Sequence, residues 1–141
     1  MKLHILGVNG PFPESNGATS GYLLEAEDTL LQFDLGSGVL ARLTALMPPE
    51  SLSALFLTHW HFDHTADLTV LLYRLEAMGQ VLQVYAPVDE SSAIRKIVSA
   101  SACDASIFLT GFPLSRCALI LSSKAPSAII FLSPVFCSFL L

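Results

Sequence analysis

Alternation of apolar and polar residues near the start of the chain predicts three β-strands. Residues 2–8 alternate with the two-residue period of a strand, and residues 20–26 and 29–34 do so again on either side of Glu27-Asp28. The short polar break between the second and third segments is typical of an antiparallel hairpin. Its buried face is expected to consist of five apolar residues, Leu23, Leu24, Leu30, Leu31 and Phe33.

Apolar residues spaced three and four apart predict two amphipathic helices further along the chain. The first helix is expected over residues 37–46 and ends before Pro48-Pro49, and the second is expected over residues 65–79 and ends at Gly79. The expected inward-facing side chains are Val39, Leu40, Leu43 and Leu46 in the first helix and Leu68, Leu71, Leu72, Leu75 and Met78 in the second.

The remaining segments alternate between strand and helix. The apolar run 53–57 is expected to form a buried strand before the second helix, and residues 81–86 form another strand after it. A last helix is expected from Asp89 to about Ala100. Three strands followed by alternating helices and strands predict a mixed α/β fold.

The segment after the run at 53–57 holds four side chains that can bind metal: His59, His61, Asp63 and His64. His59 and His61 are two residues apart at the end of a strand, so both can point to one side and share one ion. Asp63 and His64 begin the turn into the next helix, where a neighbouring second ion comes within reach. A chance group of surface histidines is disfavoured because the chain has only four histidines.

Neutral imidazoles with one carboxylate suit Zn²⁺, and a mixed nitrogen and oxygen shell also accepts Mn²⁺ or Fe. Such ions lower the pKa of water, so two of them roughly 3.5–4 Å apart support hydrolysis without a protein nucleophile. Two other polar residues are expected to stay outside the site. His4 is interpreted as a strand histidine with local hydrogen bonds, and Asp67 as a residue that favours the dipole of its own helix.

The run His59-Trp60-His61-Phe62-Asp63-His64 resembles the H-x-H-x-D-H signature of the metallo-β-lactamase superfamily. Residues 7–21 and 33–38 are similar to the opening of its ribonuclease Z-like branch of small metallo-hydrolases, and the resemblance covers about residues 1–90. It implies an αββα sandwich with two zinc ions, in which His59 and His61 bind the first ion. Asp63 and His64 would bind the second ion, and Asp63 would also orient or deprotonate the attacking water.

The resemblance also gives roles to two segments before the motif. It places the loop 9–17 along the rim of the metal cleft and Asp34 near the metal loop, where its carboxylate would support a ligand. Sequence alone leaves a second role open for Asp34, that of a carboxylate near a helix start.

Composition limits the binding partners and the cellular compartment that are expected for the protein. Net charge −5 and a pI near 5.1 give no basic surface for nucleic acid, so RNA would have to be held by the metals or by a partner subunit. Three cysteines, Cys103, Cys117 and Cys137, lack paired spacing, which is typical of a reducing cytoplasm. The first residues do not have the pattern of a signal peptide.

The chain changes character past about residue 97. Few charged residues follow, no histidine follows His64, and the family resemblance ends. We therefore expect residues 1–96 to form the N-terminal half of a metallo-β-lactamase-type sandwich, apparently truncated, and residues 97–141 to form an atypical apolar tail.

Three origins of this tail are considered. It could replace the second sheet, or residues 125–141 could bind a membrane or partner, although a membrane span needs about 20 apolar residues. The interpretation that we favour is non-native sequence from a frameshift or a truncated gene model, because three features change together there.

These observations predict a metal-dependent hydrolase, a phosphodiesterase similar to ribonuclease Z, which acts on a small ester, a phosphodiester or RNA. The alternatives are a catalytically incomplete metal-binding fragment and a protein whose tail binds a membrane or partner. Half a sandwich would leave an apolar sheet face open, so self-association or aggregation is expected. Two protein ligands for each ion predict weak metal binding.

Overall fold

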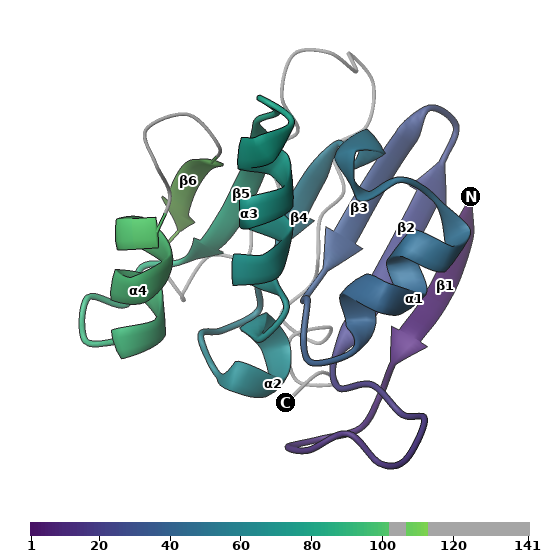
Figure 1. Cartoon of the computed structure of the whole chain (residues 1–141), viewed down its shortest axis with the longest axis horizontal. Coiled ribbons are helices and arrows are strands. Elements are labelled where there is room, and N and C mark those ends of the chain that lie inside the picture. Colours follow the sequence, from purple (N-terminus) through teal and green to yellow (C-terminus); the bar gives the residue numbers. More distant parts are fainter. Residues whose placement is uncertain (102–106, 113–141) are drawn as a thin grey trace.

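A computed structural model shows one mixed β-sheet with helices on one of its faces (Figure 1). The structure describes residues 1–101 and 107–112. The three cysteines and the segment 125–141 lie outside the described residues, so the interpretations placed on them stay predictions. Among the described residues, no helix is long and apolar enough to span a membrane.

The six strands follow one another across the sheet in chain order. They are β1 (Lys2–Gly7), β2 (Gly21–Ala26), β3 (Thr29–Phe33), β4 (Ala54–Phe56), β5 (Leu82–Pro87) and β6 (Ile107–Phe112). β2 is antiparallel to both β1 and β3, whereas β3 to β6 are parallel to one another. The first five confirm the predicted strands to within one residue at each end, and β6 extends the sheet beyond them.

Helices connect the parallel strands and lie over one face of the sheet (Figure 1). They are α1 (Val39–Leu46), the short 3₁₀ helix η1 (Pro49–Ser51), α2 (Phe62–Thr65), α3 (Leu68–Ala77) and α4 (Ala93–Ser101). The helix expected over 65–79 is therefore shorter, and α2 precedes it as a separate turn. The expected start of the last helix at Asp89 is wrong, because the Asp89 carboxylate accepts hydrogen bonds from the Ser91 and Ser92 amides in a turn before α4.

The expectation of a single buried face in the hairpin is wrong, because apolar residues occupy both faces of the sheet. Leu23 packs against the helices in the main core, together with Leu55 and Val84. Leu24 and Leu31 belong to a second cluster on the opposite face. Neighbouring residues in a strand point to opposite sides, so the run Leu23-Leu24 cannot serve one face.

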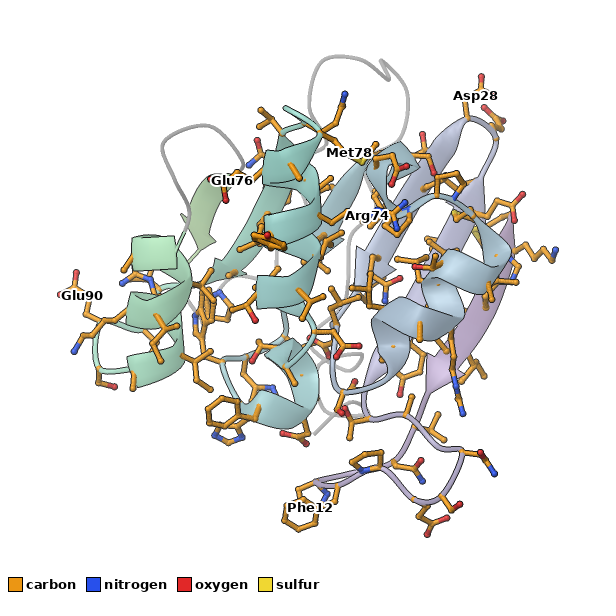
Figure 2. All side chains as sticks on the ribbon, viewed as in Figure 1. Phe12, Asp28, Arg74, Glu76, Met78 and Glu90 are labelled. Carbon is orange, nitrogen blue, oxygen red and sulfur yellow. The ribbon has the colours of Figure 1, made fainter. Side chains whose placement is uncertain are left out.

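The inward faces of α1 and α3 are mostly as predicted. Val39 and Leu43 are buried in α1, and the buried residues of α3 are Leu68, Leu71, Leu72 and Leu75. The expected burial of Leu46 and Met78 is wrong, since both are exposed at the ends of their helices (Met78 in Figure 2). Arg74 attaches the outer side of α3 to η1 through an ion pair with Glu50 at 3.0 Å.

The start of α1 is capped by a residue that lies between α2 and α3. Gly38, which precedes α1, has no side chain to cap it, and Asp67 Oδ2 accepts a hydrogen bond of 2.9 Å from the Leu40 amide. Burial raises the pKa of Asp67, against the opposing effect of the backbone N–H donors around it. Asp67 also stands at the N-terminal end of α3, where its charge is expected to favour the helix dipole, but its side chain makes no capping hydrogen bond to α3.

Substitution of Asp67 tests this cap. Asp67→Ala leaves the first N–H groups of α1 without their acceptor and is expected to lower the free energy of unfolding by about 1 kcal/mol. Asp67→Asn keeps an acceptor without the buried charge, so it should retain most of the stability at neutral pH. Urea denaturation of both variants measures the difference, and an equal loss in both would contradict the capping role.

The pH dependence of Asp67→Asn provides a second measurement. Because the pKa of Asp67 is raised by folding, the folded protein binds this proton more tightly than the unfolded chain does. The wild type should therefore gain stability relative to Asp67→Asn as the pH falls from neutrality through the raised pKa, towards the unfolded-state value of about 4.

Candidate metal centre

Three strands end at the same edge of the sheet and bring the predicted site residues together. β1 and β3 are both antiparallel to β2, and β4 is parallel to β3, so these three strands run in one direction. The loop 9–17 follows β1, Asp34 follows β3, and His59 lies shortly after β4. Loops at the carboxyl ends of parallel strands are a common place for binding sites.

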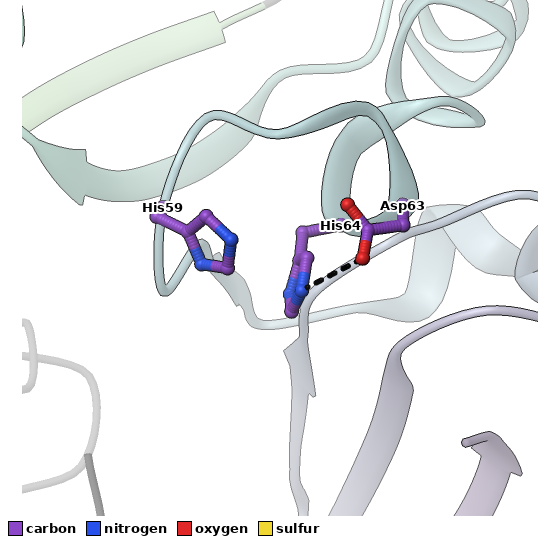
Figure 3. Close-up of side chains that lie close together, drawn as sticks. All are labelled: His59, Asp63 and His64. Carbon is purple, nitrogen blue, oxygen red and sulfur yellow. Dashed lines mark ion pairs between the residues drawn. The ribbon is translucent and has the colours of Figure 1, made fainter. Parts of the chain in front are cut away.

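His59, Asp63 and His64 each bring a possible ligand atom within 4.8 Å of the others. Figure 3 shows the three side chains converging from the loop after β4 and from α2. Asp63 Oδ2 lies 3.4 Å from His64 Nε2, and Asp63 and His59 are partly open to solvent while His64 is buried. Two imidazoles and one carboxylate, gathered at this spacing, are a donor set that fits Zn²⁺.

His61 lies beside this group and is more exposed. The centres of the His61 and His59 rings are 4.5 Å apart, and those of His59 and His64 are 3.9 Å apart. The structure therefore brings His59 close to Asp63 and His64 and keeps His61 next to His59, and the expected division of these residues between two ions stays a prediction.

A buried carboxylate supports the group from behind. Asp34 is fully buried and accepts hydrogen bonds from the Thr58 amide at 2.8 Å and from the Ser20 hydroxyl at 3.1 Å. The Thr58 hydroxyl lies 2.9 Å from Asp34 Oδ2, and His64 Nδ1 lies 2.7 Å from the same oxygen. These donors offset the cost of burying the charge.

Asp34 also determines which ring nitrogens face the centre. A carboxylate only accepts hydrogen bonds, so the neutral His64 ring must carry its proton on Nδ1, which leaves the Nε2 lone pair towards Asp63. The Thr58 hydroxyl donates to Asp34 and can then accept from His59 Nδ1 at 3.0 Å. Both imidazoles thus have Nε2 available to a metal ion.

The two imidazoles have opposite pKa shifts. Burial is the largest influence on the pKa of His59 and lowers it, and the neighbouring His64 and His61 rings lower it further. Burial also lowers the pKa of His64, but the hydrogen bond and charge of Asp34, together with the charge of Asp63, outweigh it and raise the pKa overall.

Close backbone contacts keep the metal loop against the rest of the edge. The Ser20 amide donates to Asp63 O at 3.1 Å, and the Leu35 amide donates to His64 O at 2.7 Å. A side-chain carbon at Gly36 would lie 1.9 Å from Asp63 O, so only glycine permits this approach. Asp34 itself has a φ of 53°, a left-handed conformation that aspartate adopts more readily than most residues.

Two polar residues predicted to stay outside the site do so. His4 Nε2 is 3.0 Å from Glu25 Oε2 on the neighbouring strand, which confirms its local hydrogen bond. Asp67 is engaged at the start of α1. Sequence reasoning gave no role to Thr58 and Ser20, because a hydroxyl residue beside a histidine motif is too common to be a signal.

Comparison with known proteins supports the same assignment. The family model of the metallo-beta-lactamase superfamily matches residues 16–96. The chain is 45% identical over 73 residues to the Bacillus subtilis (strain 168) protein named "probable metallo-hydrolase YhfI", covering 52% of this chain and 30% of that protein. It is 30% identical over 93 residues to a ribonuclease Z of Methanosarcina acetivorans, covering 62% of this chain and 30% of that enzyme.

Solved structures share the fold. The crystal structure of YhfI from Bacillus subtilis matches with a TM-score of 0.72 and 30% identity, over 84% of this chain and 47% of that one. Human tRNase Z, short form, matches in fold with a TM-score of 0.63 and 24% identity, over 77% and 43% of the two chains. The chain spans about 30% of the length of the curated relatives described here. On the match of residues 16–96 to the family model, this chain belongs to the metallo-beta-lactamase superfamily.

Proposed function

We propose that this chain carries the metal-binding part of a hydrolase that cleaves phosphodiesters with a metal-activated water. The observation that carries the proposal is the convergence of His59, Asp63 and His64, with both imidazole Nε2 atoms left available by Thr58 and Asp34. His61 is included as a fourth proposed ligand because its ring lies next to that of His59.

A zinc ion, or Mn²⁺ or Fe in its place, would supply Lewis acidity, which lowers the pKa of water and stabilises negative charge on a phosphoryl oxygen. The side chains have separate tasks. His59, His61 and His64 offer neutral nitrogen ligands, and Asp34 keeps His64 in the required tautomer. Asp63 is partly exposed, so its carboxylate can both bind the ion and orient a water or accept its proton.

The substrate class is inferred from the relatives. Ribonuclease Z and tRNase Z are named for RNA cleavage, which favours a phosphodiester or RNA over a simple ester. The alternative is a metal-binding fragment without activity. Residues 1–96 remain the proposed hydrolase portion and 97–141 the proposed atypical tail, and the cysteine pattern supports a cytoplasmic location.

Metal content gives the direct test of the ligand set. The purified chain is expected to bind zinc and to lose it on dialysis against a mild chelator, because few protein ligands surround each ion. His59→Ala, His61→Ala and His64→Ala should each lower the zinc content measured by elemental analysis, and should abolish hydrolysis of bis(4-nitrophenyl) phosphate.

His4→Ala is the matched control, since His4 pairs with Glu25 outside the centre. It should leave zinc content and hydrolysis unchanged. A zinc-free wild type would remove the metal site, whereas a zinc-bound wild type without activity would leave the metal-binding fragment as the better description.

The proposed role of Asp34 can be measured without metal. In Asp34→Asn the carboxylate charge beside His64 is lost, so burial should dominate and the pKa of His64 should fall, as followed by NMR titration of its ring protons. Zinc affinity should fall by about 10–100-fold. Asp28→Asn, at the opposite end of the molecule in Figure 2, is the control, and an unchanged pKa of His64 in Asp34→Asn would contradict the role.

We also propose that the chain self-associates through the β1 edge of the sheet face opposite the helices. Residues paired across strands share one side of a sheet, so two apolar rows cross this face. The rows consist of Leu3, Leu24, Leu31 and Ala54, and of Ile5, Tyr22, Phe33, Phe56 and Tyr85. Leu31, Ala54 and Phe56, in the middle of these rows, are buried. Leu3 and Ile5, on the edge strand β1, are exposed.

A charge placed on this face tests the proposal. Ile5→Lys should reduce the concentration-dependent association seen by sedimentation velocity, because Ile5 is 64% exposed and its replacement removes no core contact. Val70→Lys, at a site 58% exposed on α3, is the control and should associate like the wild type. A wild type that stays monomeric at all concentrations would refute the proposal.

A further inference from the structure

Two exposed phenylalanines belong to the two segments that meet at the candidate metal centre, α2 and the loop after β1. Phe62 directly precedes Asp63 in α2 and is 68% exposed, and Phe12, in the loop after β1, is 78% exposed. The large apolar ring of an exposed phenylalanine is in unfavourable contact with water, and a bound apolar group would remove part of that contact. Scattered exposed apolar residues are common, and these two differ because they lie on the segments that carry or approach Asp63.

The loop that carries Phe12 passes the centre. A methyl group built at Gly10 would lie 3.6 Å from Asp63 Oδ2, so the backbone runs alongside this carboxylate two residues before Phe12. Figure 2 shows Phe12 at the outer end of the loop, at the same end of the molecule as α2.

Hydrogen bonds hold both ends of this loop. The Arg42 guanidinium of α1 donates to Leu6 O at 2.6 Å, just before the loop, and also to Asn16 O near its end. The Asn9 amide donates to Ala18 O at 3.0 Å and closes the base of the loop. A loop attached in this way loses less conformational entropy when a ligand binds.

The net charge of the chain independently favours an apolar contact with the substrate. With a net charge of −5, the chain has no excess of positive charge with which to hold a polyanionic substrate. Proteins bind unpaired nucleotides through stacking of bases on aromatic side chains, and this contact does not depend on positive charge.

We propose that Phe12 and Phe62 form an aromatic binding site beside the metal centre for a planar ring of the substrate, next to the bond that is hydrolysed. The ring is either a nucleobase or an aryl group. This inference rests on the proposed phosphodiester hydrolysis. It specifies the substrate class as phosphodiesters in which one of the two ester groups carries an aromatic ring that contacts the phenylalanines.

Pairs of ligands with and without a ring measure the site directly. In calorimetric titrations of the zinc-loaded full chain, phenylphosphonate is compared with methylphosphonate for an aryl ring, and adenosine 5′-monophosphate with ribose 5-phosphate for a nucleobase. The wild type should prefer the ring-bearing member of at least one pair by roughly threefold to tenfold. The pair with the larger preference identifies the source of the ring.

Truncation of each phenylalanine assigns the preference. Phe12→Ala and Phe62→Ala should bring the two members of the pair close to equal affinity, and both side chains are exposed enough for the fold to tolerate their loss. Tyr73→Ala, which removes a ring that is 76% exposed on α3, should keep the wild-type preference. A wild type without preference, or a preference that survives both phenylalanine variants, overturns the proposal.

Hydrolysis separates this inference from the proposed function. The kcat/KM for bis(4-nitrophenyl) phosphate relative to methyl 4-nitrophenyl phosphate should fall in the two phenylalanine variants, chiefly through KM. If both diesters are cleaved and the ratio does not change, the aromatic site is wrong and the hydrolase stands. If ring preference in binding is lost in the variants but the wild type cleaves neither diester, the aromatic site stands and the hydrolase is wrong.

Discussion

The buried carboxylate of Asp34 is the contact on which the arrangement of the centre depends. Removing a charged carboxylate from water costs free energy. Hydrogen bonds donated by Ser20, Thr58 and His64 offset this cost for Asp34. These donors come from two separate parts of the chain, the start of β2 and the segment between β4 and the end of α2. Loss of any one would leave the carboxylate short of a partner, so the strand ends and α2 are held in one arrangement.

The same edge of the sheet shows why this arrangement is possible. Three strands that run in one direction deliver their following loops to one place, and backbone hydrogen bonds then join those loops directly. Gly36 allows the metal loop to approach closer than any side chain would permit. The ligands are therefore positioned by backbone as well as by side chains, which lowers the entropy that metal binding must overcome.

The sheet has two apolar faces with different surroundings. The face that includes Leu23 and Val84 packs under the helices and forms the main core. The other face carries a stack of aromatic rings, with the centres of Phe56 and Tyr85 4.7 Å apart. The described residues thus form one helical layer and one sheet layer of the αββα arrangement that the family resemblance implies.

Sequence by itself determined the strands, the order of the elements and the group of candidate ligands, because two-residue alternation and the spacing of His59, Asp63 and His64 are properties of near neighbours. Tertiary structure decided everything that joins distant segments. The contact of Asp34 with His64 and that of Asp67 with α1 each span a long stretch of chain, and they exist only because of the strand order and register. Local periodicity holds no information about such distances, so the sequence left the role of Asp34 open and did not predict the contact of Asp67 with α1.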